Sequence, residues 1–291
     1  MKRAILSVLL LTLFIAGCRD VPYEEATGWT SLFNGSDLSG WDTYLGPPHD
    51  GIEIPDSLTR FEEEAMGLNY DPMQVFTVVE EGGAPAIRIS GQIWGGISTA
   101  DDFQDYHLKL EFKWGQKRWP PRDKAKRDSG VLYHAVGPHA AGGAFWMRSH
   151  ELQVQEGDCG DYWGVAGAIA DIPATVTLDS SYRYHTGAPM RTFSPYNETG
   201  RHCIKYPDTE KPTGEWNTLE LFCHGDTSVH LVNGVRNMVL FNLRQSGNGE
   251  TFSPLAEGKI QIQSEGAEVF YRNIRIRPLE QIPENYLKQQ D

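Results

Sequence analysis

Positive charge is scarce in this 291-residue chain, where 26 Lys and Arg stand against 39 Asp and Glu. Nucleic-acid partners need a basic footprint for their phosphates, so the net charge of -13 argues against that class. The one basic cluster, from Lys113 to Arg127, contains Trp119-Pro120-Pro121 and is interpreted as a solvated loop.

Cysteine is scarce as well. Apart from Cys18 there are only Cys159, Cys203 and Cys223, and no C-x-x-C spacing occurs. The missing spacing argues against a structural zinc site. Three cysteines allow at most one internal disulfide, and the sequence leaves the pairing open.

Long apolar runs are absent except for a short one at the N-terminus, from Ala4 to Ile15. It follows the positive Lys2 and Arg3, and it is too short for the ~20 residues of a spanning helix. The small residues before Cys18 are similar to a bacterial lipoprotein signal. We therefore expect residues 1–17 to be a signal peptide, and Cys18 to carry a lipid that anchors the exported protein in the cell envelope. The alternative is a buried N-terminal helix.

Helical periodicity is nearly absent, and Pro55 to Glu64 is the best helix candidate. Strand signals dominate instead. From Tyr106 to Trp114 apolar and polar residues alternate, which is typical of an antiparallel strand with one wet face. Gly82-Gly83 and Asn233-Gly234 predict hairpin turns. Many short strands joined by such turns predict an all-β protein, a single sandwich or jelly roll.

Weak patterning marks one long segment, from Cys159 to Glu215. It is rich in Gly, Pro, Tyr and Asp, and only Thr175 to Leu178 suggests a short strand. A loop of this length in a compact domain is often functional. We expect it to consist of loops over one rim or face of the sandwich.

The segment from His150 to Asp158 is the best candidate for chemistry. As a strand it would turn Glu151, Gln153 and Gln155 to one face, where amide and carboxylate oxygens suit sugar hydroxyls. Glu156 would join that face through a bulge, and two carboxylates there could act as acid and base or hold a metal ion. The alternative is an edge strand with a polar solvent face.

Aromatic residues and histidines surround this segment in the sequence. Aromatic rings stack on the apolar faces of sugar rings, so the sequence predicts a carbohydrate partner. His134 is a candidate catalytic residue, although a lone histidine is more often structural. The candidate substrate-binding residues are Gln153, Gln155, Tyr133, Trp146, Trp163 and His185.

The opening Leu32-Phe33-Asn34-Gly35-Ser36-Asp37-Leu38-Ser39-Gly40-Trp41 resembles that of the 3-keto-disaccharide hydrolase domain. Further segments with the same resemblance follow in the family's order: Phe112-Lys113-Trp114-Gly115, Asp128-Ser129-Gly130-Val131-Leu132-Tyr133, Gly214-Glu215-Trp216-Asn217-Thr218, Leu231-Val232-Asn233-Gly234 and Val269-Phe270-Tyr271-Arg272-Asn273-Ile274-Arg275-Ile276. The resemblance implies a concanavalin-like jelly roll over residues 29–280, between a linker of residues 18–28 and a tail of residues 281–291.

The resemblance also implies action on glycosides oxidised at C3. A C3 ketone acidifies the C2–H bond, so a base can form an enolate that expels the anomeric substituent before water adds. Such a site needs a base, an enolate-stabilising group and an acid. Glu151, Glu156 and His134 are suitable catalytic residues, and a divalent metal ion held by the three would supply a Lewis acid.

Two other functions stay open. The pattern from Glu151 to Glu156 also resembles the E-x-D-x-x-E strand of laminarinase-like retaining glycosidases. Gln153 stands in place of the central Asp, which counts against that mechanism. The same sandwich also serves as a non-catalytic, lectin-like carbohydrate-binding module.

Overall fold

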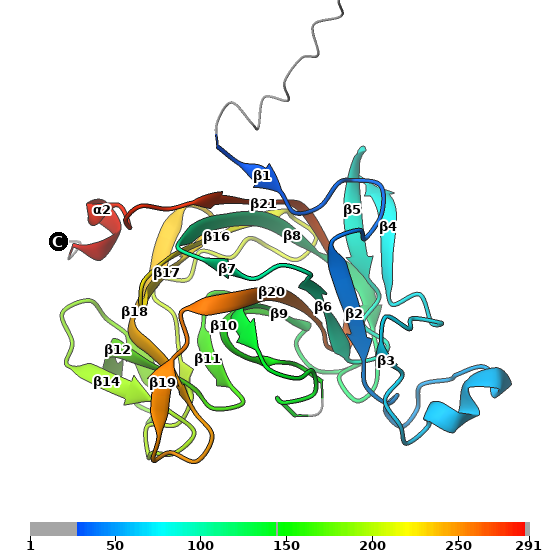
Figure 1. Cartoon of the computed structure of the whole chain (residues 1–291), viewed down its shortest axis with the longest axis horizontal. Helices are drawn as coiled ribbons and strands as arrows, with labels where there is room; N and C mark the ends of the chain where they lie inside the picture. The colour runs from blue at the N-terminus through cyan, green and yellow to red at the C-terminus, as the bar shows by residue number, and fades with distance from the viewer. Residues whose placement is uncertain (1–27, 144, 289–291) are drawn as a thin grey trace, which may run out of the picture.

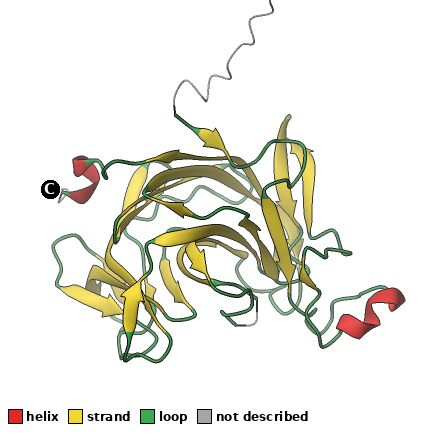
Figure 2. Cartoon of the chain, viewed as in Figure 1, coloured by secondary structure: helices red, strands yellow, loops and turns green. Residues whose placement is uncertain are grey.

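The computed structural model describes residues 28–143 and 145–288. The expected signal peptide and Cys18, the expected site of lipidation, therefore lie outside the described residues. Strands make up most of the chain, and the two helical segments of the described part are short (Figure 2). They are the 3-10 helix η1 (Asp56–Phe61) and the helix α2 (Glu284–Leu287). The helix expected between residues 55 and 64 is thus a 3-10 helix. No helix among the described residues is long and apolar enough to cross a membrane.

The strands form two large sheets (Figure 1). The larger sheet contains β1 (Thr30–Ser31), β4 (Phe76–Glu81), β5 (Ala84–Ile89), β8 (Tyr106–Arg118), β12 (Ala168–Val176), β13 (Tyr182–Tyr184), β14 (Met190–Phe193), β16 (Asn217–His224), β17 (Thr227–Val232), β18 (Val235–Ser246), β19 (Phe252–Pro254) and β21 (Ala267–Pro278). Its main path is β13-β12-β18-β17-β16-β8-β21-β5-β4.

The smaller sheet contains β2 (Trp41–Leu45), β3 (Gly67–Leu68), β6 (Gly95–Thr99), β7 (Phe103–Gln104), β9 (Asp128–Val136), β10 (Arg148–Gln155), β11 (Tyr162–Val165), β15 (His202–Cys203) and β20 (Glu257–Ser264). Its path is β15-β11-β10-β9-β20-β6-β2-β3, with β7 paired to β20. Neighbouring strands in both sheets pair antiparallel, as at β9–β10 and β9–β20. The all-β jelly-roll sandwich predicted from the sequence is confirmed.

The core lies between the two sheets. On β8 the apolar residues Leu108, Leu110, Phe112 and Trp114 are buried at alternate positions. They share one apolar cluster with buried side chains of the smaller sheet: Val131, Tyr133, Leu152, Val154, Ile260 and Ile262. Burial of this apolar area is the main force that holds the two sheets together. The polar residues that alternate with the cluster on β10 must therefore face away from the larger sheet.

Both predicted hairpin turns are present. Gly82-Gly83 joins β4 to β5, and Asn233-Gly234 joins β17 to β18. Asn233 has φ 53° and Gly234 has φ 78°, which is the pair of positive values that a type I′ turn requires.

The segment from Cys159 to Glu215 is more ordered than the expected loops. It contributes β11 and β15 to the smaller sheet, and β12, β13 and β14 to the larger one. β12 shows no alternation because most of it is buried on both faces, and Pro173 interrupts its pattern. The three cysteines of the described chain, Cys159, Cys203 and Cys223, are buried and free, so the one disulfide that they would allow is not formed.

Candidate active site

A cavity of about 260 Å³ lies on the face of the smaller sheet that is turned away from the larger sheet. Its residues come from β9, β10, β11 and β20 and from the loops beside them. We call it the carboxylate cavity, and it is lined by Arg122, Asp128, Gly142, Gly143, Trp146, Glu151, Gln153, Gln155, Trp163, Val165, Arg201, Gln263 and Glu265.

Three carboxyl groups meet in this cavity. Asp128 is the first residue of β9, Glu151 lies on β10, and Glu265 follows β20 directly. Asp128 is 3% exposed and Glu151 is 5% exposed, so water screens their interaction poorly. Buried carboxylates of like charge cannot all ionise without a large electrostatic cost.

Two arginines partly neutralise the negative charge of these carboxyl groups. Arg122 Nη2 lies 2.5 Å from Asp128 Oδ2, and its Nη1 lies 3.7 Å from Glu265 Oε1. Gln155 Nε2 donates a hydrogen bond of 2.5 Å to the same Asp128 oxygen. Arg201 lines the cavity with its guanidinium group 5.0 Å from the ring centre of Trp163. The cavity thus contains two cationic groups that can stabilise negative charge.

The carboxyl groups hold their protons more tightly than usual. Burial raises the pKa of Glu151 to about 8, the nearby charge of Asp128 adds to this, and Arg201 and Gln263 oppose it. Burial also raises the pKa of Asp128 to about 7, against the opposing charge of Arg122. The pKa of Glu265 is raised well above its usual value by burial and by the charges of Asp128 and Glu151. Near neutral pH, Glu151 can therefore donate a proton while Asp128 can accept one.

Gly130 of β9 leaves the space in which Glu151 is held. A Cβ atom on this glycine would overlap Glu151 Oε1 and Gln263 Oε1. Gly130 pairs with Gln153 across the β9–β10 ladder, so both neighbouring strands are fixed in register at this point. The absence of a side chain at residue 130 therefore sets the position of the Glu151 carboxyl group.

Five of the residues proposed from the sequence line this cavity: Glu151, Gln153, Gln155, Trp146 and Trp163. Trp146 is held by a hydrogen bond of 2.9 Å from its Nε1 to the carbonyl oxygen of Gly95. The period of two along β10 brings the three polar residues to one face, as the sequence predicted.

The other four proposed residues lie elsewhere. Tyr133 is buried in the core, where its hydroxyl contacts Ser228 Oγ at 2.8 Å and His230 Nε2 at 3.0 Å. His134 is also buried, its Nδ1 lies 3.2 Å from the carbonyl oxygen of Leu255, and its ring packs on Tyr133. His185 is exposed in the turn after β13 and lines neither this cavity nor the one beside it.

Glu156 does not return to the face of Glu151 through a bulge. It lies in the turn after β10, where both of its oxygens contact Arg127 Nη1 at 3.0 and 3.1 Å. Burial raises the pKa of Glu156, but the hydrogen bond from Thr213 and the hydrogen bonds and charge of Arg127 together outweigh it. The pKa of Glu156 is therefore lowered from its usual value. Glu151, Glu156 and His134, which were expected to hold a metal ion together, therefore lie in three different environments. Within residues 28–143 and 145–288, no group of three or more His, Cys, Asp or Glu side chains is arranged to hold one.

Sequence reasoning missed Asp128, Glu265 and both arginines. Asp128 opens one of the family-like segments, which was the available signal for it. Arg122 belongs to the basic cluster that was interpreted as solvated, yet it reaches the buried carboxyl groups. Glu265 and Arg201 carry no local pattern, because only the pairing of β20 with β9 and of β15 with β11 brings them to the site.

Comparison with known structures finds proteins of low sequence identity to this chain. A Parabacteroides distasonis structure described as a "putative glycosyl hydrolase" is 18% identical, with a TM-score of 0.46, over 89% of this chain and 98% of the other. The carbohydrate binding module CBM66 from Bacillus subtilis is 10% identical, with a TM-score of 0.39, over 69% of this chain and 91% of the other. No curated protein matches the chain.

A family model gives the assignment. The model of the 3-keto-alpha-glucoside-1,2-lyase-like domain matches residues 28–277, which is most of the chain and nearly all of the described part. This range contains both sheets, apart from the last residue of β21, and every residue of the carboxylate cavity. The chain belongs to the 3-keto-alpha-glucoside-1,2-lyase-like domain family.

Proposed function

We propose that this protein cleaves 3-keto-glycosides, with the oxidised sugar ring bound in the carboxylate cavity. The observation that carries the proposal is the meeting of Asp128, Glu151 and Glu265 with Arg122 and Arg201 in one cavity. The family assignment supports the same substrate class.

The reaction begins with the Asp128 carboxylate, which takes the proton from C2 of the keto sugar. The electrons of that C–H bond form a C2–C3 double bond and move negative charge onto the C3 oxygen, which gives an enolate. When the enolate collapses back to the ketone, the C1–C2 double bond forms and the C1–O bond breaks with its electrons on the leaving oxygen. Protonated Glu151 gives that oxygen a proton, and the guanidinium groups stabilise the negative charge that develops on the C3 oxygen. Water then adds to the double bond, which makes the overall result a hydrolysis.

The test is turnover of 3-keto-trehalose and trehalose, followed by mass spectrometry. The wild-type protein should cleave the keto form alone, because only the ketone acidifies C2–H. Glu151→Gln should lower kcat by about 100-fold or more, since it removes the proton donor. The matched control is Glu111→Gln, because Glu111 pairs with Arg272 on the larger sheet and lies outside the cavity.

Two outcomes would contradict the proposal. Cleavage of trehalose itself would favour an ordinary glycosidase. Binding of either sugar without turnover would favour the lectin-like module, which the same fold also serves.

For the N-terminus we propose export with a lipid on Cys18 that anchors the domain to the membrane of the cell envelope. The support is the charged start, the short apolar run and the small residues before the cysteine. Metabolic labelling with radioactive palmitate tests this. Label should enter the wild-type protein and not Cys18→Ser, and equal labelling would contradict the proposal.

A further inference from the structure

A second cavity, of about 530 Å³, adjoins the carboxylate cavity. Gln153, Gln155 and Trp163 line both, so the two spaces meet along one line of side chains. The second cavity is lined in full by Gln153, Gln155, Gly157, Asp158, Asp161, Trp163, Arg183, His202, Ile204, Lys205, Tyr206 and Asp208. A ligand that fills the carboxylate cavity can extend past Trp163 into this space.

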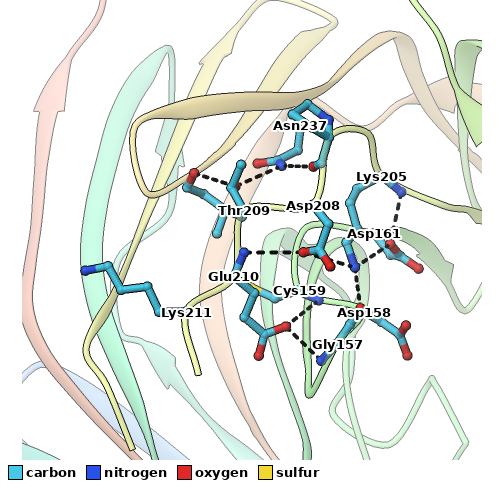
Figure 3. Close-up of polar contacts among 12 residues, drawn as sticks. Gly157, Asp158, Cys159, Asp161, Lys205, Asp208, Thr209, Glu210, Lys211 and Asn237 are labelled. Atoms are coloured by element: carbon cyan, nitrogen blue, oxygen red, sulfur yellow. Dashed lines mark hydrogen bonds and ion pairs between the residues drawn. The ribbon is translucent and has the colours of Figure 1, made fainter. Parts of the chain in front are cut away.

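The wall of the second cavity is fixed by buried polar contacts (Figure 3). Lys205 is 6% exposed, and its Nζ donates a hydrogen bond of 2.5 Å to the carbonyl oxygen of Gly157. Glu210 Oε2 accepts hydrogen bonds from the backbone N–H of Gly157 at 2.8 Å and of Cys159 at 3.4 Å. Asn237 of β18 donates to the carbonyl oxygen of Pro207 at 2.6 Å. The segment between β15 and β16 is thus held from both sides, and the cavity is formed before a ligand binds.

Four of the five Asp, Lys and Arg side chains that line the second cavity are already paired, and Arg183 is the fifth. Asp158 lies 2.6 Å from Lys126 Nζ, while Asp161 and Asp208 lie 3.9 and 3.8 Å from Lys205 Nζ. A charged ligand would have to compete with these pairs, whereas hydroxyl groups can both donate to the carboxylates and accept from Lys205 and Arg183. The lining therefore favours a neutral polyhydroxylated ligand.

His202 presents one free ring nitrogen beside Trp163. Its Nε2 lies 2.8 Å from Oδ2 of the buried Asp161, and this carboxylate accepts a hydrogen bond from the Nε2–H that fixes the ring. The His202 ring stacks on Trp163 with a centroid distance of 4.3 Å. No hydrogen bond to its Nδ1 is found within the described part of the chain, so this atom can accept one from a ligand hydroxyl. Tyr206, which is 55% exposed at the same cavity, offers an open aromatic face.

We propose that the second cavity is the subsite for the leaving-group sugar of a neutral disaccharide, which stacks on Tyr206 and donates a hydroxyl hydrogen bond to His202 Nδ1. The inference rests on the proposed function for one point, which is that the reacting ring occupies the carboxylate cavity. The preferred substrate is then a 3-keto-disaccharide rather than a 3-keto-glycoside with a small leaving group.

The test compares 3-keto-trehalose with methyl 3-keto-α-glucoside, whose leaving group is too small to fill the second cavity. The ratio of kcat/KM for the two substrates should favour the disaccharide in the wild-type protein. Tyr206→Ala should lower that ratio by about fivefold or more, because it removes the stacking face. His202→Phe keeps an aromatic ring against Trp163 and should lower the ratio as well. Tyr70→Ala is the matched control, because Tyr70 is 40% exposed and lines neither cavity.

Binding of unoxidised trehalose, measured by saturation-transfer NMR, tests the subsite without turnover. The signal should weaken in Tyr206→Ala and His202→Phe and persist in Glu151→Gln and Tyr70→Ala. If no keto-glycoside is turned over but this binding pattern holds, the proposed reaction fails and the sugar subsite stands. If Tyr206→Ala changes neither the kcat/KM ratio nor trehalose binding, the subsite proposal is wrong.

Discussion

At the scale of single residues, the reaction proposed for the site depends on which carboxyl groups carry a proton. Asp128 and Glu151 lie on neighbouring strands, and burial raises the pKa of both. Arg122 and Gln155 hold Asp128 closer to ionisation, whereas the charge of Asp128 itself raises the pKa of Glu151 further. Two buried carboxyl groups with different partners can therefore take the two roles of base and acid.

This difference predicts a bell-shaped pH dependence of kcat/KM for 3-keto-trehalose. Activity should rise as the pH increases through about 7, where Asp128 loses its proton, and fall through about 8, where Glu151 loses its own. Initial rates are measured across this pH range. The rates of the base-catalysed reaction, measured in buffer alone and with Glu151→Gln, are subtracted from them. A rate that keeps increasing above the pKa of Glu151 would show that no protonated carboxyl group is needed.

A second residue-scale prediction concerns Gly130, whose missing side chain makes room for the Glu151 carboxyl group. Gly130→Ala should displace that group and lower kcat by roughly 100-fold, because a small misplacement of a catalytic group is costly. Steady-state kinetics and thermal unfolding of the same samples check this. Gly247→Ala is the control, since the nearest side-chain atom to its added Cβ is Arg148 Nη2 at 4.0 Å. Full activity in Gly130→Ala would contradict the assigned position of Glu151.

At the scale of elements, the alternation of polar and apolar residues predicted some strands and not others. On β8 and β10 polar residues on one face alternate with apolar residues on the other, so the period of two is visible in the sequence. β12 is buried on both faces along most of its length, and β11 and β15 are short, so none of them gives a pattern. Of the carboxylate cavity, the sequence predicted the three polar residues of β10 and the two tryptophans Trp146 and Trp163. Asp128, Glu265 and Arg201 are remote in the sequence and meet only through the pairing of strands.

Asn237 supports an element-scale prediction. It is fully buried on β18 and holds the segment after β15 through hydrogen bonds to Pro207 at 2.6 Å and to Thr209 Oγ1 at 3.3 Å. Asn237→Ala should lower the free energy of unfolding by about 1–3 kcal/mol and free this segment locally. Denaturant titration and hydrogen exchange of residues 205–211 check both effects. Amides of the β4–β5 hairpin serve as the internal control, and unchanged exchange at 205–211 would show that Asn237 does not hold the wall.

At the scale of the whole molecule, the candidate active site and the apolar core lie on opposite faces of the smaller sheet. The family places the chain among carbohydrate-active domains, and the two adjoining cavities described above lie on the outer face of the smaller sheet. The space between the sheets holds a second group of polar residues, in which His134, His150 and His230 surround Tyr133. These histidines cannot serve the carboxylate cavity, because they lie on the opposite side of the smaller sheet among core residues.

The interior histidines predict a loss of stability in acid. Burial lowers the pKa of His134 to about 4, of His230 to about 3, and of His150 well below its usual value, so the folded protein holds them neutral. Because the unfolded chain binds protons below about pH 6.5, each histidine should reduce the unfolding free energy by roughly 2 kcal/mol at about pH 5. Denaturant titrations at neutral and acidic pH measure this. His230→Gln should weaken the pH dependence, and the exposed His185→Gln should not. An equal slope in His230→Gln and the wild-type protein would mean that His230 is protonated in the folded core or has no part in acid unfolding.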